Sequence, residues 1–198
     1  MCFIGVEKDN MFSSYYDDFK KIFANKDEKY RNIKIDGESY FIYVNFSCCK
    51  FKLKEPDLFW HISSIGSDEL TEIDGQKKYK DFYPCVNTEF LNRCIYDCKS
   101  SNNSFLAANN RFPCVFRSSC INKIPQILTG YINNDYMITS WTKENRFFIR
   151  SKIGTIDYVL IFEKKEKSKV LVLITAFPVV LNSYKRKFDE ESKNMVKV

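Results

Sequence analysis

The chain has 198 residues, of which 44% are hydrophobic and 16% aromatic, and its formal net charge is +6. This composition supplies enough apolar surface for a core and excludes a disordered chain. No run of about 18 apolar residues occurs, and the first residues, MCFIGVEKDN, do not resemble a secretory signal. The expected protein is therefore cytoplasmic, with no membrane segment.

The first quarter of the chain predicts one helix followed by a β-hairpin. Residues 11–25 place their apolar side chains at helical spacing. Two runs of alternating apolar residues then flank the pair Asp36-Gly37, and an Asp-Gly step in this position is typical of a hairpin turn. We therefore expect a helix and then two paired strands.

The middle of the chain predicts shorter helices. The segment 55–64 begins with Glu55 and Pro56, a residue that suits the first turn of a helix. A second helix is expected over 87–99, followed by a loop over 100–111. The segment 117–134 also has a helical pattern, and Pro125 either splits it or starts a new helix.

The last third of the chain changes to the pattern of strands. Three segments, 145–152, 155–165 and 169–180, are rich in Val, Ile, Phe and Tyr. Short connections between them favour antiparallel pairing. In the last strand, Leu171, Leu173 and Thr175 are predicted to share one face, and a C-terminal helix closes the chain.

The predicted fold class is therefore α+β, with N-terminal helices packed on a C-terminal antiparallel sheet of about four strands and an N-terminal β-hairpin. A single domain over 1–198 is expected. Residues 1–38 would hold the N-terminal helix and the first hairpin strand, and 39–190 the core, with an insertion at 66–115.

Eight cysteines and one histidine limit the metal chemistry that the chain can carry. The cysteine spacings do not form a pair of CxxC knuckles, and with one histidine a zinc site would need mostly cysteines. Without a secretory signal, reduced and partly buried thiols are expected. We predict no metal site and no cofactor.

The positive charge lies at the C-terminal end. From Lys143 to Val198 there are 13 Lys and Arg residues against 7 Asp and Glu residues, so this quarter holds the whole excess of +6. A localised basic surface is a candidate site for a polyanion. A solvated lysine-rich surface without a ligand explains the same charge equally well.

Several short motifs follow one another along the chain. They are FWHI (59–62), RSSCINKIP (117–125), RFFIRSK (146–152), DYVLIFE (157–163), LITAF (173–177) and YKRKF (184–188). In their order and spacing they resemble a family of phage and prophage proteins within the nuclease-like group of barnase, EndoU, the tRNA-cleaving colicins and RelE (BECR). The resemblance covers roughly residues 40–190, except for 66–115.

The resemblance implies a ribonuclease that needs no metal. In this group, helices pack on an antiparallel sheet that carries the active site. The ribose 2′-OH attacks the adjacent phosphate and leaves a 2′,3′-cyclic phosphate. RNA, with tRNA as one candidate, would be the substrate. A toxin or phage-defence role and a dedicated antitoxin or immunity protein would follow.

Residue chemistry agrees with that implication. Histidine suits proton transfer because its ordinary pKa of about 6.5 lies near neutral pH, and arginine binds phosphate through a planar, permanently charged fork. The catalytic candidates are His61, Arg117, Thr175 and Tyr184. The RNA-binding candidates are Arg146, Arg150, Lys185 and Arg186.

Each candidate also has an ordinary structural interpretation. His61 could pack at the edge of a core, Arg117 could cap a helix, and Thr175 could be a satisfied polar residue in an apolar strand. The basic residues could be surface charges. The principal alternative function is a non-catalytic module that binds RNA or protein on the same fold.

Overall fold

The computed structural model describes residues 10–24, 29–48, 50, 55–66, 70–73, 76–79, 111–152 and 156–193. The chain divides into two compact units, each made of two separate segments. One unit comprises residues 1–17 and 46–119, and the other comprises 18–45 and 120–198. We call them the helical unit and the sheet unit. Each is described by itself, so the expected single domain stays a prediction.

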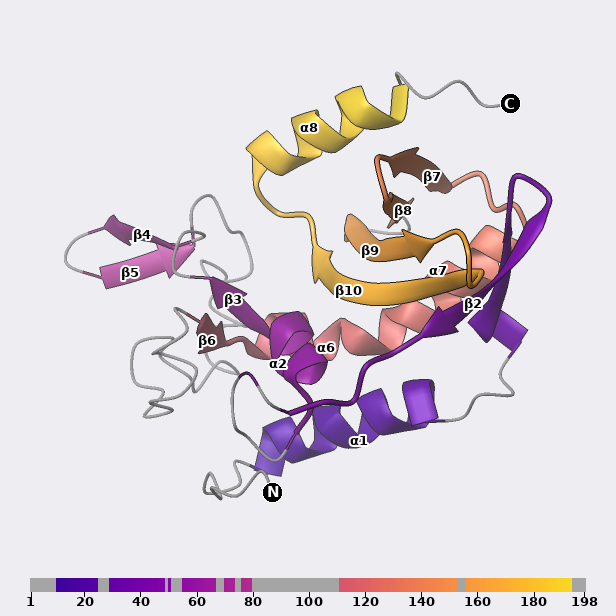
Figure 1. The fold of residues 1–198 in the computed structure, drawn as a ribbon. Helices are drawn as coiled ribbons and strands as arrows, with labels where there is room; N and C mark the ends of the chain where they lie inside the picture. Colours follow the sequence, from indigo (N-terminus) through magenta and orange to yellow (C-terminus); the bar gives the residue numbers. More distant parts are fainter. Residues whose placement is uncertain are drawn as a thin grey trace. The chain divides into compact units, whose positions relative to one another are not determined.

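The sheet unit is built on six strands in the order β1-β2-β10-β9-β8-β7. Their bounds are β1 Asn32–Ile35, β2 Glu38–Tyr43, β7 Ile138–Lys143, β8 Arg146–Ser151, β9 Tyr158–Lys165 and β10 Val170–Pro178. The last four strands pair antiparallel in chain order. The sheet curls as it passes from the hairpin to β7 (Figure 1).

The predicted hairpin forms where the Asp-Gly pair requires it. Asp36 and Gly37 both have positive φ, 51° and 81°, which matches the twist of a two-residue hairpin. Ile33 then lies opposite Tyr40, and both are buried. These contacts confirm the hairpin that the sequence predicted.

The prediction of a separate antiparallel sheet of about four strands is wrong in one respect. β2 pairs with β10 in parallel, with Leu171 opposite Ile42, so the hairpin extends the C-terminal strands into one mixed sheet. The sequence could not reveal this pairing, because more than a hundred residues separate the two strands and short-connection arguments apply only to neighbours in the chain.

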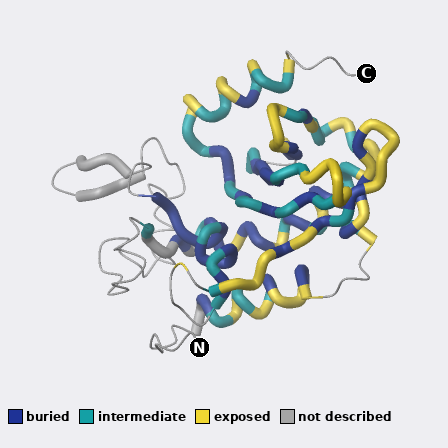
Figure 2. The backbone as a smooth tube through the Cα atoms, in the orientation of Figure 1, coloured by how far each residue is buried: buried dark blue, intermediate teal, exposed yellow. Residues whose placement is uncertain are grey.

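Helices cover both faces of this sheet. α7 (Ile124–Ile132) lies on one face, where Tyr131 contacts Phe147 with ring centroids 5.8 Å apart. α8 (Asn182–Lys193) lies on the other, where Phe188 contacts Phe148 at 6.2 Å. Five of the six residues of β8 are consequently buried, and these include the polar residues Arg150 and Ser151. Figure 2 shows exposure concentrated on the loops and on α8.

A β-bulge changes the face to which Thr175 belongs. Leu173 pairs with Phe162 and Thr175 with Ile161, so Ile174 is an extra residue in β10. A bulge reverses the alternation of side chains beyond it. Thr175 therefore lies on the face of Ile161 that α8 covers, whereas Leu171 and Leu173 lie on the opposite face. The prediction that these three residues share a face is wrong.

The helical unit contains short elements. They are α2 (Asp57–Ser63), α6 (Val115–Ser119), β3 (Ser64–Gly66), β4 (Leu70–Ile73), β5 (Gln76–Tyr79) and β6 (Arg111–Pro113). β3 and β6 pair antiparallel, with Ser64 opposite Pro113. The two strands that flank residues 67–110 therefore lie side by side, and the predicted insertion at 66–115 stays a prediction.

Other predicted elements have mixed outcomes. The N-terminal helix is α1 (Asn10–Ala24), which contributes to both units, and the short helix 55–64 is α2. Pro125 lies in the first turn of α7 and so starts a second helix. The predicted helix 87–99 and nearly all of the loop 100–111 lie outside the described residues.

Among the described helices, none is long and apolar enough to cross a membrane.

Candidate functional site

α2 places His61 on the least buried side of a helix that is otherwise almost enclosed. Pro56 precedes the helix, and the Asp57 carboxylate accepts a hydrogen bond from the Lys50 backbone N–H at 2.8 Å. Leu58, Phe59, Trp60 and Ile62 are buried, whereas His61 is half-buried. Trp60 packs at 5.8 Å from the ring of Phe12, so this aromatic contact holds α2 in the unit.

Two arginines bind the carbonyl groups at the C-terminal end of α2. Arg111 donates to the His61 carbonyl at 2.9 Å, and to the Ser64 carbonyl and hydroxyl at 2.7 Å each. Arg117 donates to the Ser64 carbonyl at 2.6 Å and is 4% exposed. The last carbonyls of a helix lack partners within the helix and carry partial negative charge, so two cations stabilise them. Arg117 is therefore a capping residue of α2.

Burial and these cations together control the protonation of His61. Burial is the largest cause that lowers the pKa of His61, followed by the charges of Arg111, Lys50 and Arg117, and together they lower it from 6.5 to about 4. At neutral pH the imidazole is therefore uncharged and can accept a proton. We call His61, Lys50, Arg111 and Arg117 the His61 cluster.

The second set of candidates lies in the sheet unit on the face that α8 covers. Arg146, Phe148 and Arg150 are alternate residues of β8 and lie on this face. Thr175 of β10 lies on the same face, because Thr175 and Phe148 both pair with Ile161 of β9. Arg146 is exposed, and Thr175 is half-buried. The sequence-based expectation that Arg146 and Arg150 share one face is confirmed.

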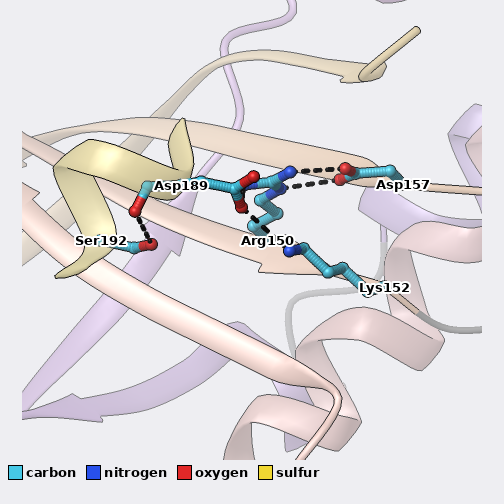
Figure 3. Close-up of polar contacts among 5 residues, drawn as sticks. All are labelled: Arg150, Lys152, Asp157, Asp189 and Ser192. Atoms are coloured by element: carbon cyan, nitrogen blue, oxygen red, sulfur yellow. Dashed lines mark hydrogen bonds and ion pairs between the residues drawn. The ribbon is translucent and has the colours of Figure 1, made fainter. Parts of the chain in front are cut away.

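Arg150 lies buried in a network of ion pairs. It is 1% exposed, and its guanidinium binds both oxygens of Asp157 at 2.8 and 2.6 Å and Asp189 of α8 at 2.9 Å (Figure 3). Lys152 also donates to Asp189 at 2.9 Å. In this arrangement α8 encloses Arg150, so a phosphate could reach it only after α8 moves, and the predicted RNA contact of Arg150 stays a prediction.

The candidates on α8 differ in exposure. The Tyr184 ring lies 6.2 Å from the rings of Phe177 and Phe188, so it packs on the sheet. Lys185 is half-buried and Arg186 is exposed. Tyr184 has a packing role, whereas Arg186 is accessible to a ligand.

The structure thus brings the candidates together in two groups. His61 and Arg117 belong to the helical unit, and Arg146, Arg150, Thr175, Tyr184, Lys185 and Arg186 belong to the sheet unit. Sequence reasoning missed Arg111 and Lys50. Arg111 reaches His61 through the pairing of β3 with β6, and no local pattern in the sequence signals that pairing.

The prediction of reduced cysteines is confirmed at two described residues and wrong at a third. Cys114 and Cys120 are free and buried, in agreement with the expected reduced thiols. Cys48 is disulfide-bonded, so the same expectation is wrong there. Within the described residues, no group of three or more His, Cys, Asp or Glu side chains could hold a metal ion.

No family model matches the chain, and no curated protein or solved structure matches it significantly. The resemblance to the BECR nuclease group therefore stays a prediction. The geometry of the described residues is what supports a function.

Proposed function

We propose that this protein is a metal-independent ribonuclease whose proton-transfer residue is His61. The observation that supports the proposal is the His61 cluster, in which an uncharged imidazole adjoins the charges of Arg111, Lys50 and Arg117. RNA cleavage by the ribose 2′-OH needs a base beside cations that stabilise the negative charge developing on phosphorus. The cluster combines these two properties.

The lowered pKa of His61 suits a site that is activated by its substrate. Without an anion, burial and the surrounding cations together disfavour the protonated imidazole. A bound phosphate would offset the charge of the cations and so raise the pKa of His61 toward the range in which histidine is an effective base. His61 would then accept the 2′-OH proton, while Arg111 and Arg117 attract the phosphate.

The remaining candidates have supporting roles in this proposal. Arg146, Lys185 and Arg186 would contact the RNA backbone, and Thr175 and Tyr184 would complete the substrate surface of the sheet unit. The substrate class is RNA, with tRNA as one candidate, and the products carry a 2′,3′-cyclic phosphate. A toxin or phage-defence role with an antitoxin or immunity protein belongs to the same proposal.

The test is incubation of the purified protein with total RNA in the presence of EDTA. We expect cleavage by the wild type, termini that carry a 2′,3′-cyclic phosphate, and a loss of activity of at least about 100-fold in His61→Ala. Ser119→Ala, an exposed change in the same unit, is the control and should cleave normally. Equal persistence of RNA with wild type and His61→Ala across a range of enzyme concentrations would contradict the proposal.

A non-catalytic RNA-binding module is the second candidate. The hydrogen bonds from Arg111 and Arg117 to the carbonyls of His61 and Ser64 favour it, because they give both arginines a structural role. This alternative predicts RNA binding that weakens with salt, without cyclic phosphate termini. The same incubation, followed by analysis of the RNA ends, separates the two.

A further inference from the structure

The two faces of the sheet are covered in different ways. The face under α7 is a continuous apolar core that includes Ile33, Ile35, Ile42, Phe147, Ile149, Leu160, Phe162, Leu171 and Leu173. The face under α8 carries a smaller apolar cluster of Trp141, Phe148, Val159, Ile161 and Val179, with Phe177 packed against it. Of the twelve residues of α8, all described, Phe188 is buried in this cluster and Tyr184 packs against it. α7 buries Ile124, Ile127 and Leu128 and packs Tyr131 on Phe147, so α8 is held by fewer apolar side chains than α7.

Ion pairs add to the attachment that Phe188 and Tyr184 give to α8. Asp189 accepts hydrogen bonds from Arg150 and Lys152, each at 2.9 Å. Glu191 binds Lys143 of β7 at 2.7 Å. Because Asp189 is 40% exposed and Lys152 50% exposed, water can compete for this attachment. A short polar helix held in this way is less stable than the sheet on which it lies.

The surface beneath α8 has the residue types of a nucleic acid platform. Trp141 and Phe148 are stacked with ring centroids 4.9 Å apart and an interplanar angle of 2°. Arg150 lies on the same face of β8, and Thr175 is on this face of β10. Flat aromatic side chains beside an arginine on a sheet bind single-stranded nucleic acid, because bases stack on the rings and the arginine binds phosphate.

Two consecutive residues of α8 occupy both parts of this surface. The Phe188 ring lies 5.7 Å from Trp141 and 6.2 Å from Phe148. The neighbouring Asp189 carboxylate binds Arg150. An aromatic ring next to an anion therefore covers the stacked rings and the arginine, and a nucleotide presents the same two groups.

We propose that α8 is a displaceable cover over a binding site for single-stranded RNA, and that Phe188 and Asp189 occupy the places of a base and a phosphate. Displacement of α8 would expose Trp141, Phe148, Arg150 and Thr175 together. The choice of RNA rests on the proposed function, whereas the displacement of α8 does not.

The test compares two substitutions on α8 that remove the same charge. Asp189→Asn removes the ion pairs with Arg150 and Lys152 but leaves the paired contact of Arg150 with Asp157. Glu190→Gln changes an exposed neighbour and serves as the control. The readouts are backbone hydrogen exchange and the affinity for a fluorescent single-stranded RNA with 2′-O-methyl groups, which cannot be cleaved by 2′-OH attack.

In Asp189→Asn we expect the amides of α8 to exchange about tenfold faster or more, because the variant weakens the two charge-assisted hydrogen bonds from Arg150 and Lys152. The amides of β8 and β9 should keep their wild-type rates. The affinity for the oligonucleotide should rise by about the same factor, because a larger fraction of molecules is competent to bind. Glu190→Gln should change neither readout.

Two results would overturn the proposal. Equal exchange of α8 in the two variants would show that the Asp189 contacts do not retain the helix. Faster exchange with unchanged affinity would show that the uncovered face does not bind RNA. Neither result depends on catalysis, so each can be distinguished from the failure of His61 to support cleavage.

Discussion

The side chain with the most informative environment is His61. Its imidazole is half-buried at the end of α2, and the nearby charges of Arg111, Lys50 and Arg117 oppose a further positive charge. Because the unfolded chain removes both the burial and the cations, His61 binds a proton more readily there than in the folded protein. Its protonation is therefore linked to folding.

The sign of that linkage gives a stability prediction. The pKa of His61 is about 4 in the folded protein and about 6.5 when unfolded, so between these values the unfolded state binds more protons. We expect its contribution to the unfolding free energy to be complete above pH 6.5 and to be lost as the pH falls to 4, by at most about 3 kcal/mol.

Chemical denaturation of the wild type and of His61→Gln, measured at intervals from pH 4 to pH 7, tests this linkage. Glutamine is polar and does not titrate, so the variant should show a flatter dependence over this window. Carboxylates contribute the same background slope to both proteins. Parallel curves would mean that the pKa of His61 is not lowered in the folded state.

At the scale of elements, the hairpin of β1 and β2 forms because of the residues in its own turn. Gly37 has φ of 81° in the turn, a conformation that glycine adopts without strain. A Cβ atom at this position would meet no heavy atom within 4 Å, so backbone strain alone would oppose another residue.

Gly37→Ala should therefore lower the unfolding free energy by about 1–2 kcal/mol, the cost of placing a Cβ in the left-handed region. Urea denaturation measures this change. Ser39→Ala, an exposed substitution in the adjoining strand, should change the stability by less than about 0.5 kcal/mol. Equal stability of the two variants would contradict the strain.

The bulge in β10 is a feature that the local sequence does not predict. The alternation of residues 170–177 predicts one uninterrupted strand, yet Ile174 is inserted and Thr175 changes face. No residue in the segment is a characteristic bulge former such as glycine. The register is decided instead by the neighbours: β9 pairs with β10 throughout, while β2 pairs with its first residues.

At the scale of the whole molecule, the charge distribution is the feature with functional meaning. The excess of +6 lies in residues 143–198, and these belong to the sheet unit. Three consecutive basic residues, Lys185, Arg186 and Lys187, lie on α8, and the last two are exposed. Such a surface attracts a polyanion of any sequence and does so less strongly as salt increases.

RNA binding should therefore fall steeply with salt. Replacing Lys185, Arg186 and Lys187 together with glutamine should reduce the slope of log K against log salt by up to about 2, since each released counterion contributes about 0.7 for a single strand. Replacing Lys21, Lys29 and Lys34 removes the same charge from exposed positions elsewhere and should alter the slope less. Fluorescence anisotropy at several salt concentrations measures both, and equal slopes would show that α8 is not a preferred contact.

Local sequence determined the features that depend on neighbours in the chain. The helix periodicity of 11–25, the Asp36-Gly37 turn, the helix that begins near Pro56 and the strands of the last third each follow from spacing or from the conformational limits of single residues. Tertiary structure alone decided the parallel pairing of β2 with β10, the Arg111 contact at the end of α2 and the enclosure of Arg150 beneath α8. These features depend on partners far away in the sequence. The residues that neighbour a charged or apolar side chain in the sequence do not indicate which distant partner it will contact.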